Sequence, residues 1–157
     1  MSDEINYIDI ELAITKLFNI RQHIIVPNCY IELGTSNDYE CDLLIIKKSG
    51  YAVEVEIKMS LNDVKADLKK KHSHDNEKIK ELYFALPESI YDKAIEFIPE
   101  KAGLIIIRKI KDRVFAFIKR SPIINKNSRK LTLEEQLNFA RLGTMRIWNL
   151  KKKLLKD

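Results

Sequence analysis

Two β-prone runs separated by a short turn constrain the fold of this chain more than any other feature. Residues 41–47 and 51–58 are rich in valine, isoleucine and leucine, and Lys48-Ser49-Gly50 separates them. Such runs on either side of a glycine-containing turn predict a β-hairpin. A three-residue loop with its glycine in the left-handed conformation pairs Lys47 with Tyr51. A two-residue turn would shift the register by one residue, and we take the three-residue loop as the prediction.

The three-residue loop places Asp42 opposite Glu56, and strand alternation brings Glu54 and Lys58 to the same face. Directly opposed carboxylates repel each other unless a cation lies between them, and Mg²⁺ prefers such oxygens. An ordinary strand with one solvated, charged face would show the same alternation. However, the strand that carries Asp42 is apolar on both faces, which indicates a buried strand where an unpaired carboxylate is costly. The residues therefore predict a divalent-metal site, with a solvated face as the alternative.

The region around this hairpin resembles a known nuclease superfamily. Ser60 and Asp63 form a capping-box-like helix start directly after Lys58. The features shared over residues 39–107 are Asp42, Val55-Glu56-Ile57-Lys58, Ser60 with Asp63 and Asp67, Leu82-Tyr83-Phe84-Ala85-Leu86-Pro87, and Gly103-Leu104-Ile105-Ile106. In this order they resemble the PD-(D/E)xK (restriction-endonuclease-like) superfamily, and within it the MmcB-related DNA-repair proteins. One departure is Cys41, which stands where the motif name has proline.

The resemblance implies an αβββαβ core and Mg²⁺-dependent hydrolysis of DNA phosphodiester bonds, with Mn²⁺ as an alternative ion. It implies that Asp42 and Glu56 bind the metal together with the carbonyl oxygen of Ile57, and that Asp42, Glu56 and Lys58 are catalytic. Lys58 would then orient a metal-bound water for attack or lower its pKa. The candidates for an outer site are Glu11, Glu40 and Glu54, and for Glu11 an exposed helix position is the alternative.

The distribution of charge predicts where a polyanion would bind. The chain has a net charge of +5, with 12 basic and 19 acidic residues before residue 101 and 16 basic and 4 acidic residues after residue 100. Such asymmetry suits DNA, because basic side chains that neutralise phosphates release condensed counterions. A solvated basic surface that keeps the protein in solution is the alternative. The DNA-binding candidates are Lys69, Lys70, Arg129, Lys130, Arg141, Lys151 and Lys152.

The remaining pattern predicts an α/β fold with a mixed central sheet, helices on both faces and a long C-terminal helix. We expect helices at 8–18, 61–72, 88–97 and 133–155, and strands at 24–33, 41–47, 51–58, 81–86, 104–108 and 114–118. One nuclease-like domain over residues 1–157 is expected, with a core at about 8–118 and a basic, mobile loop and helix at 121–157. The last helix should pack onto the core. A homodimer contact through Trp148 and a track for the DNA backbone are the alternatives.

Two classes of function remain open at this point. The first is a Mg²⁺-dependent DNA endonuclease or repair nuclease, and the second is a catalytically inactive DNA-binding or interaction protein with the same fold. Cys29 and Cys41 lie in apolar strands and are expected to be reduced. No leader-like or bilayer-spanning apolar run is found in the sequence, so a cytoplasmic protein without membrane contact or nucleotide cofactor is expected.

Overall fold

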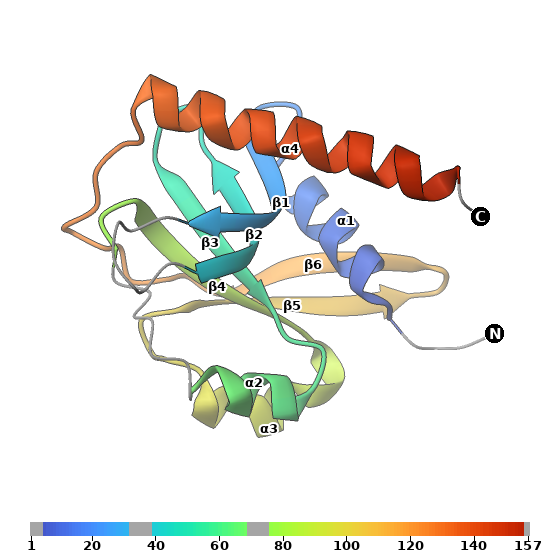
Figure 1. Cartoon of the computed structure of the whole chain (residues 1–157). Coiled ribbons are helices and arrows are strands. Elements are labelled where there is room, and N and C mark those ends of the chain that lie inside the picture. The colour runs from blue at the N-terminus through green and yellow to red at the C-terminus, as the bar shows by residue number, and fades with distance from the viewer. Residues whose placement is uncertain (1–4, 32–38, 69–75, 156–157) are drawn as a thin grey trace.

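A six-stranded mixed sheet forms the centre of the protein (Figure 1). The structure, a computed structural model, describes residues 5–31, 39–68 and 76–155. The strands lie in chain order across the sheet, and they are β1 (Ile24–Ile31), β2 (Tyr39–Ile46), β3 (Ala52–Ile57), β4 (Ile79–Pro87), β5 (Gly103–Ile110) and β6 (Arg113–Arg120). Neighbours are antiparallel from β1 to β3, parallel from β3 to β5, and antiparallel between β5 and β6.

The helices are α1 (Tyr7–Leu17), α2 (Leu61–Asp67), α3 (Tyr91–Ala94) and α4 (Leu133–Leu154). Short 3-10 helices, η1 (Glu88–Ile90) and η2 (Ile95–Phe97), flank α3, so the predicted range 88–97 is helical throughout but has α geometry only in its middle. From α1 to β4 the elements follow the order αβββαβ, and the predicted α/β fold with a long C-terminal helix is confirmed. The predicted extension of α2 beyond residue 68 lies outside the described residues.

The hairpin between β2 and β3 has the predicted three-residue loop. The Lys47 N–H donates to the Tyr51 carbonyl at 2.9 Å, and the Gly50 N–H donates back to the Lys47 carbonyl at 2.8 Å. Gly50 has φ +87°, the left-handed conformation that glycine adopts without steric strain. The predicted register is found as far as Leu43, which pairs with Val55, and the ladder ends there, one residue before Asp42.

Each face of the sheet has its own apolar layer. On one face, Ile10 and Ile14 of α1 pack on Val53 and Val55 and on inward residues of β2, β4 and β5. On the other face, α2 and α3 cover β4 and β5 through Val64 and its neighbours, while α4 packs against β1. The side chains of Glu54, Glu56 and Lys58 therefore lie on the α2 and α4 face, opposite to the valines with which they alternate.

The predicted strand at 24–33 is described as far as residue 31, and it continues through Pro27, which pairs with Leu43. Asn28, the next residue, has φ +49°. This left-handed residue breaks the simple alternation, because Val26 and Cys29, three positions apart, contribute to the same apolar cluster. A similar change occurs in β2, where Cys41 and Leu44 share that cluster, so the side-chain direction changes next to Asp42.

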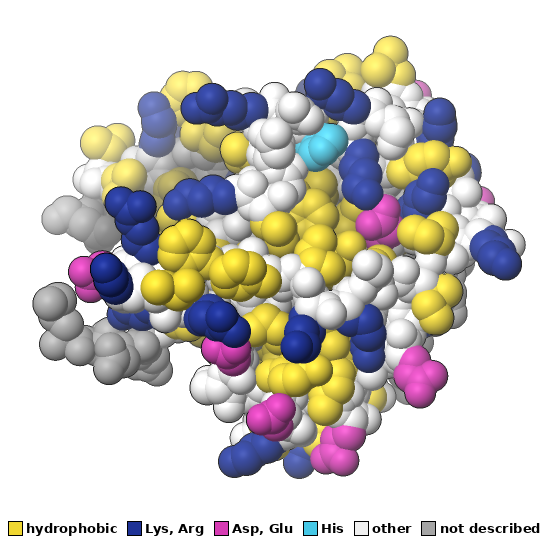
Figure 2. Space-filling view, turned by 180° about the vertical axis from the view of Figure 1, so that it is seen from behind, with side chains coloured by type: hydrophobic (Ala, Val, Ile, Leu, Met, Phe, Trp, Pro, Cys, Tyr) yellow, Lys and Arg dark blue, Asp and Glu magenta, His cyan; other side chains and the backbone are white. Residues whose placement is uncertain are grey.

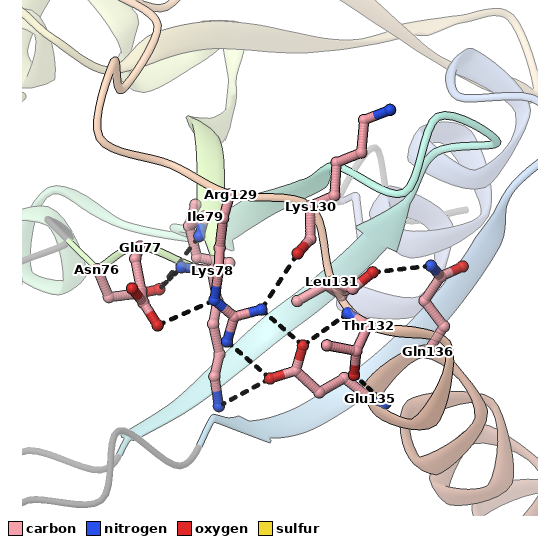
Figure 3. Close-up of polar contacts among 10 residues, drawn as sticks. All are labelled: Asn76, Glu77, Lys78, Ile79, Arg129, Lys130, Leu131, Thr132, Glu135 and Gln136. Atoms are coloured by element: carbon pink, nitrogen blue, oxygen red, sulfur yellow. Dashed lines mark hydrogen bonds and ion pairs between the residues drawn. The ribbon is translucent and has the colours of Figure 1, made fainter.

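The segment before α4 is held in place, although the sequence predicted a mobile loop. The Asn125 N–H donates to the Lys80 carbonyl, the Arg129 N–H to the Glu77 carbonyl, and the Leu131 N–H to the Gly50 carbonyl. Figure 3 shows the Arg129 guanidinium between two carboxylates, donating to Glu77 at 3.0 Å and to Glu135 at 2.8 Å. These contacts join the loop to the start of β4, to the hairpin turn and to α4.

Candidate active site

Two ionisable side chains of β3 and a third directly after the strand are buried at alternate positions. Glu54 is 0% exposed, Glu56 2% and Lys58 5%. Burying a charge is costly unless partners replace the lost water. A solvated strand face, the alternative considered from the sequence, is therefore excluded for these residues.

Lys58 connects β3 to α2. Its ammonium lies 3.1 Å from the Glu56 carboxylate and 2.9 Å from that of Asp67, and 5.5 Å from the centre of the Phe84 ring. The Lys58 backbone N–H donates to the Ala85 carbonyl of β4, which holds the residue at the end of the sheet. Burial opposes the charged form, but the carboxylates of Glu56 and Asp67 outweigh it and raise the pKa of Lys58. Lys58 is therefore a buried, charged amine.

Glu56 has the most perturbed carboxyl group of the site. Burial, followed by the negative charges of Glu54 and Asp42, raises the pKa of Glu56 to about 8, although Lys58 acts in the opposite direction. Burial and the neighbouring negative charges therefore favour the protonated form of this group. Perturbed carboxyl groups of this kind are typical of functional sites.

Asp42 lies in the fork where β2 and β3 separate. The β2–β3 ladder ends at Leu43 and Val55, and the Ile57 N–H then donates to the Asp42 carboxylate at 2.7 Å instead of to a backbone carbonyl. Asp42 thus takes the place of the next rung of the ladder. The prediction that Asp42 and Glu56 form a directly opposed pair is replaced by this arrangement. The negative charge of Asp42 nevertheless contributes to the raised pKa of Glu56.

Two residues of α1 approach Asp42 from the other side of the sheet. Burial, followed by the charge of Asp42 and a hydrogen bond to it, raises the pKa of Tyr7. Burial and the charge of Asp42 also raise the pKa of Glu11, which is half-buried. Glu11 therefore lies close enough to Asp42 for the two charges to interact, and its role in an outer site stays a prediction.

The other two predicted outer carboxylates, Glu40 and Glu54, have different surroundings. Glu54 accepts a 2.6 Å hydrogen bond from the Tyr39 hydroxyl, which in turn accepts one from the Asn76 side-chain amide at 2.9 Å. Glu40 is exposed on β2 and pairs in register with Tyr30 at the β1 side. Glu54 thus influences Glu56 from a neighbouring position, whereas Glu40 has no described contact with the site.

Tyr7 and Asp67 are two residues of the site whose roles the sequence did not predict. Tyr7 precedes Glu11 by four residues, so both lie on one face of α1, and this spacing was the available signal. Asp67 was noted only as part of a resemblance, one helix turn beyond Asp63. Its contact with Lys58 depends on how α2 packs against the sheet, which local sequence does not determine.

The donor set suits a cation that keeps several waters. Among residues 5–31, 39–68 and 76–155, no three His, Cys, Asp or Glu side chains are grouped as a metal cluster. Asp42, Glu56 and the Ile57 carbonyl would supply two carboxylates and one backbone oxygen. Mg²⁺ is often held by one or two carboxylates with water and substrate phosphate completing its shell, so these residues fit such an ion.

The predicted DNA-binding residues differ in their surroundings. Lys69 and Lys70 lie outside the described residues. Arg129 is engaged by two carboxylates, so it is less available to a phosphate than the exposed residues are. The exposed candidates are Lys130, Arg141, Lys151 and Lys152. Figure 2 shows Lys and Arg spread among hydrophobic side chains over the back of the molecule, with no single basic patch.

Comparison with known proteins defines the class to which the chain belongs. The model of the family described as DNA repair protein MmcB-like matches residues 4–154. The chain therefore belongs to the MmcB-like family of DNA repair proteins, as the resemblance predicted. No curated protein matches it.

A solved structure has the same fold. It is described as SPO1766 protein of unknown function from Silicibacter pomeroyi, and the two chains superpose with a TM-score of 0.64 at 17% sequence identity. The similarity covers 99% of this chain and 94% of the other. In the described part of this chain, no helix has the length and apolar character needed to cross a membrane.

Proposed function

We propose that this protein is a Mg²⁺-dependent nuclease that hydrolyses phosphodiester bonds of DNA during repair. The observation that carries the proposal is the convergence of Asp42, Glu56 and Lys58 where β2 and β3 separate. Membership of a DNA repair family supports DNA as the substrate. A divalent ion would compensate the carboxylates of Asp42 and Glu56, and it would favour the ionised form of Glu56 that burial disfavours.

The residues divide the chemistry among them. Asp42, Glu56 and the Ile57 carbonyl would hold the ion, which when bound supplies positive charge to the scissile phosphate and lowers the pKa of a coordinated water. The Lys58 ammonium, next to Glu56, would orient the attacking water or donate to a phosphate oxygen as negative charge increases. Asp67 acts through Lys58 as a positioning residue, because its carboxylate holds the ammonium at 2.9 Å.

A cleavage assay with isosteric variants tests this function. Supercoiled and linear DNA would be incubated with protein and Mg²⁺ or Mn²⁺, using wild type, Asp42→Asn, Glu56→Gln and Lys58→Met. We expect cleavage by wild type and a loss of about a hundredfold or more in each variant. Glu96→Gln, at an exposed carboxylate on η2, is the matched control and should cleave like wild type. Cleavage that survives in all three site variants would place the active site elsewhere.

The second candidate is a DNA-binding protein without hydrolytic activity. The observation that favours it is the contact of Lys58 with both Glu56 and Asp67, which already supplies a positive charge to the buried carboxylates. In this case wild type would bind DNA but would not cleave it with either metal. Lys152→Ala, at an exposed position outside α4's apolar stripe, should weaken DNA binding evenly across sequences and reduce its salt dependence under either function.

A further inference from the structure

The last helix has an apolar stripe that the sheet does not cover. Its inner side packs on β1, where Phe139 and Leu142 join the apolar cluster and the Arg146 guanidinium donates to the Asn28 carbonyl at 2.7 Å. Figure 1 shows α4 along the top of the molecule, with its C-terminal turns extending beyond β1 in this view. The other side of α4 remains exposed along its whole length.

The exposed stripe has the spacing of a coiled-coil seam. Its positions, separated alternately by four and three residues, are Leu133, Leu137, Ala140, Thr144, Ile147, Lys151 and Leu154. Alternation of four and three keeps one face of a helix toward a second helix. The large apolar members are exposed, Leu133 to 81%, Leu137 to 55%, Ile147 to 57% and Leu154 to 67%. Trp148, 59% exposed, lies beside this stripe.

We propose that α4 associates with α4 of a second copy of this chain in an antiparallel helix pair. The charges of the helix favour this occupant and this direction. Glu134 lies in the first turn, and Lys151, Lys152 and Lys153 lie in the last turn. An antiparallel pair sets each basic end beside the acidic first turn of the other copy and opposes the two helix dipoles. A parallel pair would instead bring the lysine clusters together.

The stripe is compatible with a two-fold symmetric register. With Ala140 of each helix opposite Thr144 of the second copy, small side chains lie at the centre and allow close approach. Leu137 then lies opposite Ile147 of the second copy. Lys151 lies opposite Leu133 of the second copy, where its ammonium can reach the neighbouring Glu134. The charged seam residue Lys151 therefore has an acidic partner in this register. Polar residues at seam positions specify register and orientation in coiled coils.

Measuring molecular mass at several concentrations tests the association. Light scattering or sedimentation would be applied to wild type, Leu137→Glu, Ile147→Glu and Met145→Glu. Met145 is the matched control, because it is 55% exposed like Leu137 but lies off the stripe. We expect wild type and Met145→Glu to form a dimer, and the two stripe variants to be monomers with unchanged circular dichroism. A monomeric wild type, or a dimer that survives in both stripe variants, would overturn the proposal.

Cross-linking tests the direction of the helices. Leu137→Cys and Ile147→Cys proteins would be oxidised separately and as a mixture, since the native Cys29 and Cys41 are buried. An antiparallel pair should cross-link only in the mixture. Cross-linking of each variant with itself would show a parallel pair and overturn the proposed geometry. Self-association through α4 does not depend on the nuclease chemistry, so failure of one proposal leaves the other intact.

Discussion

Replacing Glu56 by glutamine should change how the stability of the protein depends on pH. The native state raises the pKa of Glu56 from 4.5 to about 8, so the folded protein keeps this proton over a range in which the unfolded chain has released it. Between these values the unfolded state binds fewer protons, and the free energy of unfolding falls as pH rises. At about 1.4 kcal/mol per pH unit, wild type should lose up to roughly 5 kcal/mol across this range.

Glutamine has the shape of protonated glutamate and does not titrate, so the Glu56→Gln variant should lack this loss. Urea unfolding of both proteins from pH 5 to pH 8.5, with a chelator present, measures the difference. The two should be similar near pH 5, and the variant should become the more stable protein as pH rises. Glu96→Gln, at an exposed position, should follow wild type. Parallel curves for wild type and Glu56→Gln would refute the reasoning, because Glu56 would then be ionised throughout and fully compensated by Lys58.

Three other substitutions test the packing, each measured by urea unfolding. Arg129→Ala should lower the free energy of unfolding by about 1–2 kcal/mol, since its guanidinium bonds to two carboxylates that anchor the loop before α4, and an unchanged value would mean that the network contributes nothing. Gly103→Ala should be destabilising by about 1–3 kcal/mol, because the added Cβ would lie 2.5 Å from the Tyr83 ring. Gly143→Ala should be stabilising by about 0.5–1 kcal/mol, since the Cβ would meet Val26 at an ordinary 3.7 Å and alanine favours the helix. Equal effects of the two alanines would contradict this reasoning.

Local chemistry made several elements predictable. The left-handed Gly50 determines the three-residue loop and, through it, the register of β2 against β3. The Ser60 and Thr132 side chains cap α2 and α4, each accepting from a backbone N–H three residues later at 3.2 Å. In each case the interacting groups lie within a few residues, so the sequence contains the information.

Long-range contacts explain what the sequence did not indicate. Residues 121–130 are polar and basic, which is typical of a mobile loop, yet Asn125 bonds to β4, Arg129 bonds to α4, and the next residue, Leu131, bonds to the hairpin turn. Neither the left-handed Asn28 nor the end of the β2–β3 ladder next to Asp42 follows from the alternation of apolar residues.

For the candidate site, the sequence by itself determined which hairpin carries the acids and the amine, because strand alternation and turn chemistry act over a few residues. Only the tertiary structure decided that Asp42 lies in a fork, that Tyr7 and Glu11 approach it from α1, and that Asp67 holds Lys58. The physical reason is that burial sets the charge of these groups, and burial depends on how helices pack across both faces of the sheet.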